Sequence, residues 1–156
     1  GGNSKTIIKK QGEVLQLLKK QSNVDKDKIG AIGYRFGGRV VLEMAKAGVD
    51  LKVVASFHGS MPKPGKDSKK TTLKSAILVY HGEKDKFVKF TDIEAFKNSI
   101  STHIFQLKIY KTATHSFTNP EADKYAKKFK IPVAYDKVAD NASWKHMTSQ
   151  FKRLLK

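Results

Sequence analysis

The sequence predicts an α/β protein in which a parallel sheet is flanked by helices. Short apolar segments alternate with amphipathic ones along the chain, which is typical of strands that alternate with helices. The apolar segments are hydrophobic at successive rather than alternate positions, as expected of parallel strands buried on both faces. No fixed repeat and no linker-like stretch interrupts this pattern, so residues 1–156 are expected to form a single domain.

A helix, a strand and a second helix are expected first. Apolar side chains recur at roughly helical spacing in residues 5–20, and lysines fill the opposite side. Residues 29–33, with the sequence IGAIG, form the first expected strand. Residues 37–47 have the apolar side of a helix, and Gly48 is the residue type that commonly ends one.

The second half of the chain is expected to contain three more strands, at residues 53–57, 76–80 and 104–110. The stretch 61–72 is polar and contains Pro and Gly, which indicates a loop. Thr91–Glu94 has the pattern of a capping box and predicts a helix through about residue 101. The last helix is expected from about Tyr135 to the end. Its apolar side would consist of Trp144, Met147, Phe151 and Leu154.

The charge of the chain is strongly basic, with 31 Lys and Arg against 14 Asp and Glu and a formal net charge of +17. Such a balance can indicate a nucleic-acid or anionic-surface partner. However, the arginines that base readout and bidentate phosphate binding favour are limited to Arg35, Arg39 and Arg153. The lysines are spread over the whole chain. A solvated lysine-rich surface is therefore expected, without specific nucleic-acid binding.

The composition also limits the chemistry that is available. No cysteine is present, which excludes disulfides and thiolate metal ligands. No two histidines have the i, i+4 spacing of helical metal ligands, so no metal is expected. No apolar run approaches the roughly 18–20 residues of a membrane span, and no signal-peptide core is visible. A cytoplasmic location without a membrane partner is the resulting expectation.

The segment GYRFGG at residues 33–38 lies between the first expected strand and the following helix. Gly33 and Gly37 flank Arg35 at two residues on either side, which is the G-x-S-x-G spacing of a nucleophile elbow. In such a turn the tip residue is strained, and its flanking residues must be small. Gly38 would let the helix pack closely on the sheet, and the N–H of Phe36 would supply half of an oxyanion hole. A tight turn without a catalytic role is the alternative.

With these motifs the chain resembles the C-terminal two-thirds of the dienelactone hydrolase family of α/β-hydrolases. The segments that carry the resemblance are KIGAIGYRFGGRVVLEMAKAG, VVASFHGSM, ILVYHGEKDKFV, DIEAFK, THSFTNPEA and AYDKVADNASW. The resemblance implies hydrolysis of carboxylic esters or lactones by a Cys or Ser, Asp and His triad that needs no cofactor. It implies that Asp85 is the acid and His115 the base, and that Arg35 occupies the nucleophile position.

Arg35 departs from the family pattern in a way that bears directly on activity. A guanidinium stays protonated in proteins and has no lone pair to offer, so it cannot act as a nucleophile. The chain is therefore expected to be inactive as it stands. An alternative hypothesis is that Arg35, at a helix N-terminus, binds a small carboxylate or phosphate. A salt bridge between Arg35 and Asp85 that fills the cleft is expected in preference to such a free site.

Length is the second departure from the family. Family members extend further at the N-terminus, so the resemblance implies an α/β-hydrolase domain that lacks its first strands. The strand at residues 29–33 would then be a sheet edge, and we expect a homo-oligomer or a partner that supplies an N-terminal half. The expected ligand is a small ester, lactone or carboxylate. No arginine follows His115 in Ser116–Pro120, which argues against dienelactone itself.

The remaining histidines carry weaker expectations. His58 and His81 each follow a strand and precede a glycine at the edge where the site is expected, so a secondary role is weighed against a structural one. His103 and His146 are expected to be solvated or at an interface. Tyr34, like Phe36, is expected to pack beside the turn rather than to contact a substrate.

Overall fold

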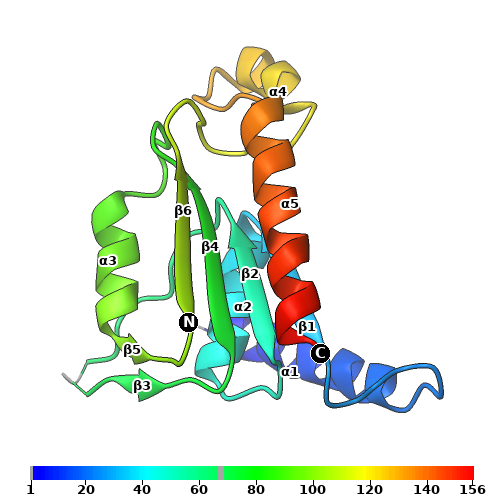
Figure 1. Cartoon of the computed structure of the whole chain (residues 1–156). Helices are drawn as coiled ribbons and strands as arrows, with labels where there is room; N and C mark the ends of the chain where they lie inside the picture. Colours follow the sequence, from blue (N-terminus) through cyan, green and yellow to red (C-terminus); the bar gives the residue numbers. More distant parts are fainter. Residues whose placement is uncertain (1, 67–68) are drawn as a thin grey trace.

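The computed structural model describes residues 2–66 and 69–156, which form a parallel sheet between two layers of helices (Figure 1). The helices are α1 (Gly2–Lys19), α2 (Phe36–Lys46), α3 (Phe90–Asn98), α4 (Ala122–Phe129) and α5 (Lys137–Leu154). The strands are β1 (Gly30–Tyr34), β2 (Val53–Phe57), β3 (Thr71–Thr72), β4 (Ala76–Gly82), β5 (Ile100–Ser101) and β6 (Phe105–Tyr110). The predicted α/β class is confirmed.

The main sheet has the strand order β1-β2-β4-β6, and all of its strands are parallel. Every residue of β2 and β4 is buried, which explains why these two segments are apolar at successive positions. The short strands β3 and β5 form a separate parallel pair. Because all four strands of the main sheet run in one direction, the segments that follow them meet at one edge.

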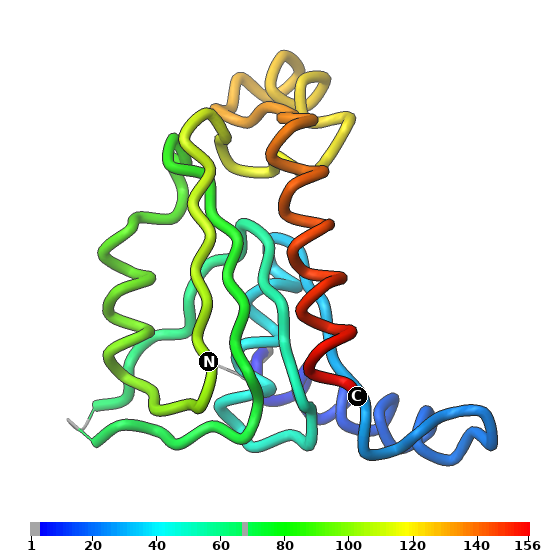
Figure 2. Tube along the Cα trace, in the orientation of Figure 1, coloured from blue at the N-terminus to red at the C-terminus, as the bar shows by residue number. Residues whose placement is uncertain are grey.

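Alternate side chains of the central strands enter two separate cores. Val54 of β2 and Ile77 of β4 lie in the core that α1, α2 and α3 cover. Their neighbours Val53 and Leu78 lie in the core that α5 covers. In Figure 1 α5 crosses in front of the sheet and α2 lies behind it. The trace in Figure 2 shows that α5 runs back from the carboxyl edge of the strands, so that the C-terminus lies near their amino ends.

Several expected boundaries and contacts differ from the structure. α3 begins at Phe90, and the backbone N–H of Lys89 donates to Oδ2 of Asp92 at 3.3 Å, so the capping box predicted to begin at Thr91 is wrong. The last helix begins after Asp136, whose Oδ1 accepts from the N–H of Ala139 at 3.0 Å. Met147 is buried as expected, but Trp144 is 50% exposed because it lies away from the sheet.

The sequence patterns did not predict α4 or the β3–β5 pair. α4 buries only Ala122, and four lysines lie in or just after its short sequence ADKYAKKF. Its apolar residues do recur at helical spacing, at 122, 125, 126 and 129, but the pattern spans only eight residues, fewer than the roughly 11–18 over which helical periodicity is assessed. β3 and β5 have two residues each, too few to show a periodicity.

β1 lies at one end of the main sheet, and its hydrogen-bonded neighbour within residues 2–66 and 69–156 is β2 alone. Ile32 and Tyr34 on this strand are 38% and 42% exposed. On α1, Val14 and Leu17 are also exposed. This part of the molecule thus presents apolar side chains and unpaired backbone to its surroundings. None of the helices in the described part of the chain has the length and hydropathy of a bilayer span.

Candidate active site

The turn between β1 and α2 holds Arg35 in an unusual backbone conformation. Its φ is 52° and its ψ is −118°, a combination that side chains with a Cβ rarely adopt and that costs about 1–3 kcal/mol. The N–H of Arg35 donates to the carbonyl of Phe57 at 3.1 Å, which ties the turn to the end of β2. The structure therefore contains the sharp strand-to-helix bend that the glycine spacing predicted.

The glycines around the turn differ in how much they are needed. A Cβ on Gly33 would lie 2.0 Å from the carbonyl oxygen of Gly37, and one on Gly38 would lie 2.6 Å from Oγ of Ser56. A side chain at residue 33 would therefore collide with the backbone, and one at residue 38 would require Ser56 to move. A Cβ on Gly37 would meet no heavy atom of the described residues within 4 Å. The prediction that residue 37 must be small is wrong for this structure.

Each strand of the main sheet is followed by one polar residue of the candidate site. Arg35 follows β1, His58 follows β2, Asp85 lies after β4, and His115 lies after β6. The parallel topology brings these four segments to the same edge, although 80 residues separate the first from the last. His58 and Ser116, like Arg35, have a positive φ, so backbone strain is concentrated here.

Asp85 and His115 form a hydrogen-bonded pair. Nδ1 of His115 lies 2.8 Å from Oδ2 of Asp85, whose side chain is fully buried. Oδ1 of Asp85 accepts from the backbone N–H groups of Phe87 and Val88, at 2.7 and 3.0 Å. Because an ionised carboxylate can only accept, Nδ1 of His115 donates this hydrogen bond, which leaves Nε2 as the ring nitrogen available for proton transfer.

The pKa of Asp85 is set by opposing effects. Burial would raise it, but the hydrogen bond from His115, those from the N–H groups of Val88 and Phe87, and the charge of His115 together hold it below its ordinary value. The carboxylate therefore remains ionised at neutral pH. A charged acid that orients an imidazole through Nδ1 is the arrangement that hydrolases use to prepare a general base.

His58 lies against this pair and is kept neutral. Its ring centroid is 5.5 Å from that of His115, and its Nε2 is 2.8 Å from Oγ1 of Thr118. Burial, followed by the charges of His115 and Arg35, lowers the pKa of His58 to about 3. Its buried Nδ1 has no hydrogen-bond partner among the described residues. Sequence alone placed His58 at this edge, but the contact with Thr118 was not predicted.

The predicted salt bridge between Arg35 and Asp85 is wrong. Both oxygens of Asp85 are taken by other donors, and Arg35 is exposed and forms no ion pair with any residue that the structure describes. Its charge contributes, after burial and the charge of His115, to lowering the pKa of His58. Phe36 opens α2, so its backbone N–H has no acceptor within the helix. Its side chain is 62% exposed rather than packed.

The surroundings of the other histidines agree with the expectations from sequence only in part. His81 is buried at the end of β4, and burial lowers its pKa. His103 is exposed, whereas Nδ1 of His146 lies 2.9 Å from the hydroxyl of Tyr80. Within the described residues no group of three or more His, Cys, Asp or Glu side chains is arranged to hold a metal ion.

A strained strand-to-helix turn and an Asp–His pair at the carboxyl edge of a parallel sheet define the α/β-hydrolase class. A family model described as the dienelactone hydrolase family matches residues 2–155. The chain therefore belongs to the dienelactone hydrolase family, and the resemblance seen in its motifs is confirmed.

Solved structures and curated proteins support this assignment. The dienelactone hydrolase-like promiscuous phosphotriesterase P91 from metagenomic libraries is 30% identical, with a TM-score of 0.80 over 96% of this chain and 62% of that one. The structure named m3DLH is 28% identical, with a TM-score of 0.84 over 99% of this chain and 64% of that one. This chain thus spans less than two-thirds of either structure.

Two curated relatives differ in how much of their length is matched. An uncharacterised protein of Caenorhabditis elegans is 34% identical over 134 residues, which cover 84% of this chain and 83% of that protein. A carboxymethylenebutenolidase homolog of Mus musculus is 25% identical over 121 residues, which cover 75% of this chain and 47% of that protein.

Proposed function

We propose that this protein has the fold of an ester or lactone hydrolase but is inactive as it stands, because Arg35 occupies the position of the nucleophile. The observation that carries the proposal is the conformation of Arg35, at φ 52° on the tip of the turn between β1 and α2. Such strain is typical of the residue that attacks the substrate in this class. A protonated guanidinium cannot make that attack.

The rest of the machinery is consistent with this proposal. A thiol or hydroxyl at residue 35 would attack the carbonyl carbon, and Nε2 of His115 would take its proton and return it to the leaving group. Asp85 would hold the imidazole through Nδ1. The N–H of Phe36 would donate to the oxyanion. Removing the nucleophile of such a triad costs roughly a factor of 10⁶ in turnover, so Asp85 and His115 alone would not sustain activity.

The Arg35→Cys variant tests the proposal directly. Because the sequence has no cysteine, the introduced thiol is the only one in the protein, and its pKa can be measured from the pH dependence of alkylation by iodoacetamide. We expect a pKa below the ordinary value of about 8.5, because the His115 imidazole stabilises a thiolate. Adding His115→Gln should return the pKa toward the ordinary value. We expect no turnover of p-nitrophenyl acetate by the unaltered protein above a heat-denatured control.

A matched control variant and three contrary outcomes complete this test. Arg153→Cys, on the exposed part of α5, should give an ordinary thiol pKa with or without His115→Gln. An ordinary pKa in Arg35→Cys would refute the assignment of residue 35 to the nucleophile position. Hydrolysis by the unaltered protein that His115→Ala abolishes would refute inactivity, and hydrolysis that survives His115→Ala would refute the site.

A small-anion site is the second candidate function, and two observations favour it. Arg35 is exposed without an ion pair to any described residue, at the N-terminus of the 11-residue helix α2. His58, 2% exposed in the same site, has a ring nitrogen without a partner among those residues. Titration calorimetry with acetate and with phosphate should give heat that Arg35→Gln removes and Arg153→Gln leaves. Equal heats for all three proteins would exclude the site.

We also propose that the free edge of β1 is covered by a further strand in the functional protein. The strand belongs either to more of this family's fold or to a second copy of the chain. The exposed apolar side chains Ile32 and Tyr34, on a strand with one hydrogen-bonded neighbour among the described residues, support this proposal. Such edges invite pairing with another chain when they are left open.

A further inference from the structure

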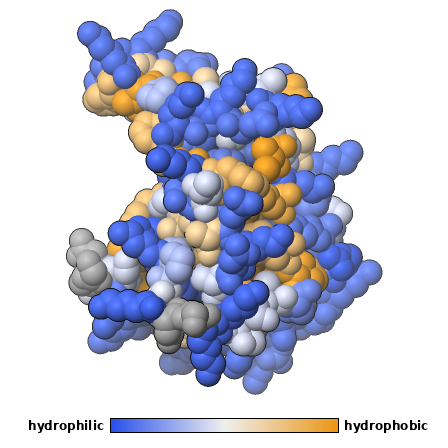
Figure 3. Space-filling view, turned by 90° about the vertical axis from the view of Figure 1, so that its left-hand side faces the viewer, coloured by the Kyte–Doolittle hydropathy of each residue, from blue (hydrophilic) through white to orange (hydrophobic). Residues whose placement is uncertain are grey.

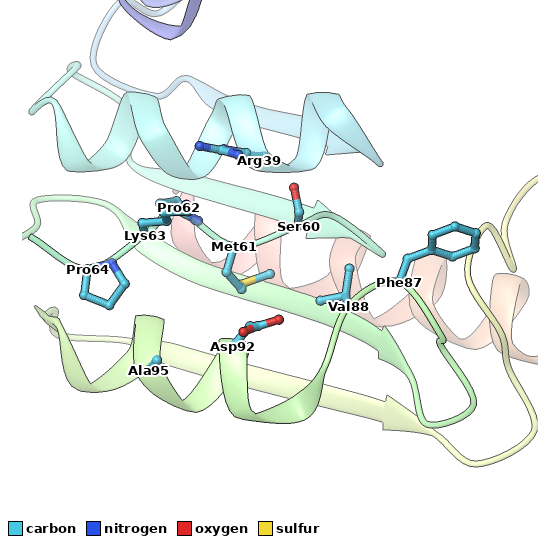
Figure 4. A pocket seen from close by; sticks show the side chains of 10 residues that line it. All are labelled: Arg39, Ser60, Met61, Pro62, Lys63, Pro64, Phe87, Val88, Asp92 and Ala95. Atoms are coloured by element: carbon cyan, nitrogen blue, oxygen red, sulfur yellow. The ribbon is translucent and has the colours of Figure 1, made fainter. Parts of the chain in front are cut away.

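A cavity of about 260 Å³ lies between α2 and α3, next to the candidate active site. Figure 4 shows Arg39 of α2 on one side and Asp92 of α3 on the other, with Met61 between them. The segment that follows β2 runs through this space, and Met61 and Lys63 come from it. The cavity is smaller than the roughly 300–1,000 Å³ of most ligand sites. It therefore suits one arm of a ligand rather than a whole cofactor.

One end of the cavity adjoins the Asp85–His115 pair. Phe87 lines the cavity, and its ring centroid is 4.9 Å from that of His115. In Figure 4 Phe87 lies at the end toward which the strands point. The N–H groups of Phe87 and Val88 also hold the Asp85 carboxylate. A ligand that extends past Phe87 would therefore have one end in the cavity and the other beside the imidazole.

The cations lie away from that end. Figure 4 shows the side chains of Arg39 and Lys63 displaced from Phe87, toward the amino ends of the strands. The guanidinium of Arg39 makes one contact, at 3.4 Å, with Oε1 of Glu43. Since a guanidinium has five N–H donors, most of its hydrogen-bonding capacity is free for a ligand. Lys63 is exposed, and its backbone carbonyl, not its ammonium, binds Lys46.

The floor of the cavity is apolar, and its wall contains one carboxylate, that of Asp92. Met61 and Val88 are 8% and 3% exposed. Oδ2 of Asp92 accepts from the N–H of Lys89, and this bond begins α3. The cavity thus combines an apolar body with cations at its far end, which complements an aliphatic chain that ends in an anion.

We propose that this cavity binds a short aliphatic chain with a terminal carboxylate, placed with its apolar carbons on Met61 and Val88. The carboxylate contacts Arg39 and Lys63 at the far end. If the fold once acted on esters as proposed above, this chain is the acyl part of the substrate, held with its ester end beside His115. The binding itself does not depend on residue 35 or on any reaction.

Hexanoate is the probe that tests the inference, and hexylammonium is its matched control. Amide chemical shifts of the ¹⁵N-labelled protein are recorded while each compound is added. We expect hexanoate to shift the amides of Met61, Val88 and Ala95 and hexylammonium to leave them unchanged. Arg39→Gln and Lys63→Gln should each weaken hexanoate binding about fivefold, because each removes a charge-assisted hydrogen bond. Arg153→Gln, which removes the same charge from α5, should have no effect.

Two further variants locate the ligand. Ala95→Trp fills the cavity from an exposed helix position, so it should abolish binding without disturbing the core. Arg35 does not line the cavity, so Arg35→Gln should leave the shifts that hexanoate causes at Met61, Val88 and Ala95 unchanged. Loss of binding in Arg35→Gln with retention in Arg39→Gln would overturn the inference and assign the carboxylate to the turn. Equal binding of hexylammonium, or unchanged binding in Ala95→Trp, would also overturn it.

Discussion

Burial determines the chemistry of individual residues in this site. The motifs alone predicted that Asp85 and His115 belong together, because their spacing follows that of a known family. Neither the pairing of Asp85 with two backbone N–H groups nor the neutral state of His58 could be predicted. Both depend on distances between segments that are remote in sequence. The prediction of an Arg35–Asp85 salt bridge was wrong for the same reason. Opposite charges attract, but sequence does not show that other donors already occupy both carboxylate oxygens.

The neutral state of His58 predicts a pH dependence of stability. Its pKa is about 3 in the folded protein and about 6.5 when unfolded, so between these values the unfolded state binds more protons. The free energy of unfolding should therefore fall as the pH is lowered from 6.5, by up to about 1.4 kcal/mol per pH unit from this residue. Urea unfolding at pH 7, 6, 5 and 4.5 measures the slope.

The variants His58→Gln and His103→Gln separate this effect from general acid destabilisation. His58→Gln should reduce the slope, and the part that remains includes His81, whose pKa burial also lowers. His103 is exposed, so His103→Gln should leave the slope unchanged. An undiminished slope in His58→Gln would show that His58 is protonated in the folded protein.

At the scale of elements, the turn between β1 and α2 shows what a motif can and cannot predict. The glycine pattern predicted the bend because a tight turn has local steric requirements. It could not distinguish Gly33, whose Cβ would meet the backbone of Gly37, from Gly37, which faces open space. That difference depends on which atoms of the folded chain come near each position.

Two alanine substitutions should therefore have opposite effects. Gly33→Ala should destabilise the protein by at least about 3 kcal/mol, because the backbone of Gly37 cannot move away without breaking the turn. Gly37→Ala should stabilise it by roughly 0.5–1 kcal/mol, since alanine favours a helix and has room here. Urea unfolding compares both with the unaltered protein. Similar losses in the two variants would contradict the steric explanation.

The strands of the main sheet are the elements whose positions the sequence predicted best. The four strands of the main sheet were placed to within a few residues, and in β2 and β4 burial on both faces explains the continuous apolar run. α4 was not predicted, because its helical spacing of apolar residues extends over only eight residues, three of which are lysines. Trp144 was assigned to the apolar side of α5 by its spacing, yet it is half exposed. Residue spacing identifies the apolar side of a helix, but packing on the sheet determines how many residues of that side are buried.

At the scale of the whole molecule, the net charge and the open edge of β1 have opposite effects on association. Figure 3 shows that hydrophilic residues cover much of the face on the α3 side, with apolar patches between them. The net charge of +17 opposes the approach of a second identical chain. The open edge of β1 favours it, because each outward N–H and carbonyl gains a partner when a strand is added.

The balance between these effects can be measured by light scattering after size-exclusion chromatography. We expect a mass above that of one chain, rising with protein concentration and with added salt, which screens the repulsion. Since the N–H of Arg35 points to β2, alternation along the strand directs that of Ile32 outward. Ile32→Pro removes this donor and should lower the mass, whereas Ile32→Val should not. A single-chain mass at all concentrations would contradict pairing with a second copy of the chain.

Both oxygens of the Asp85 carboxylate are held by its own loop and by His115, and residue 35 holds neither. The geometry of the Asp85–His115 pair thus does not depend on the side chain at residue 35. The contact between Asp85 and His115 therefore sets no requirement on the side chain at residue 35, although the strained backbone of the turn does. If residue 35 is the nucleophile position, as proposed above, a single codon change there alters the reacting group and leaves the acid–base pair in place.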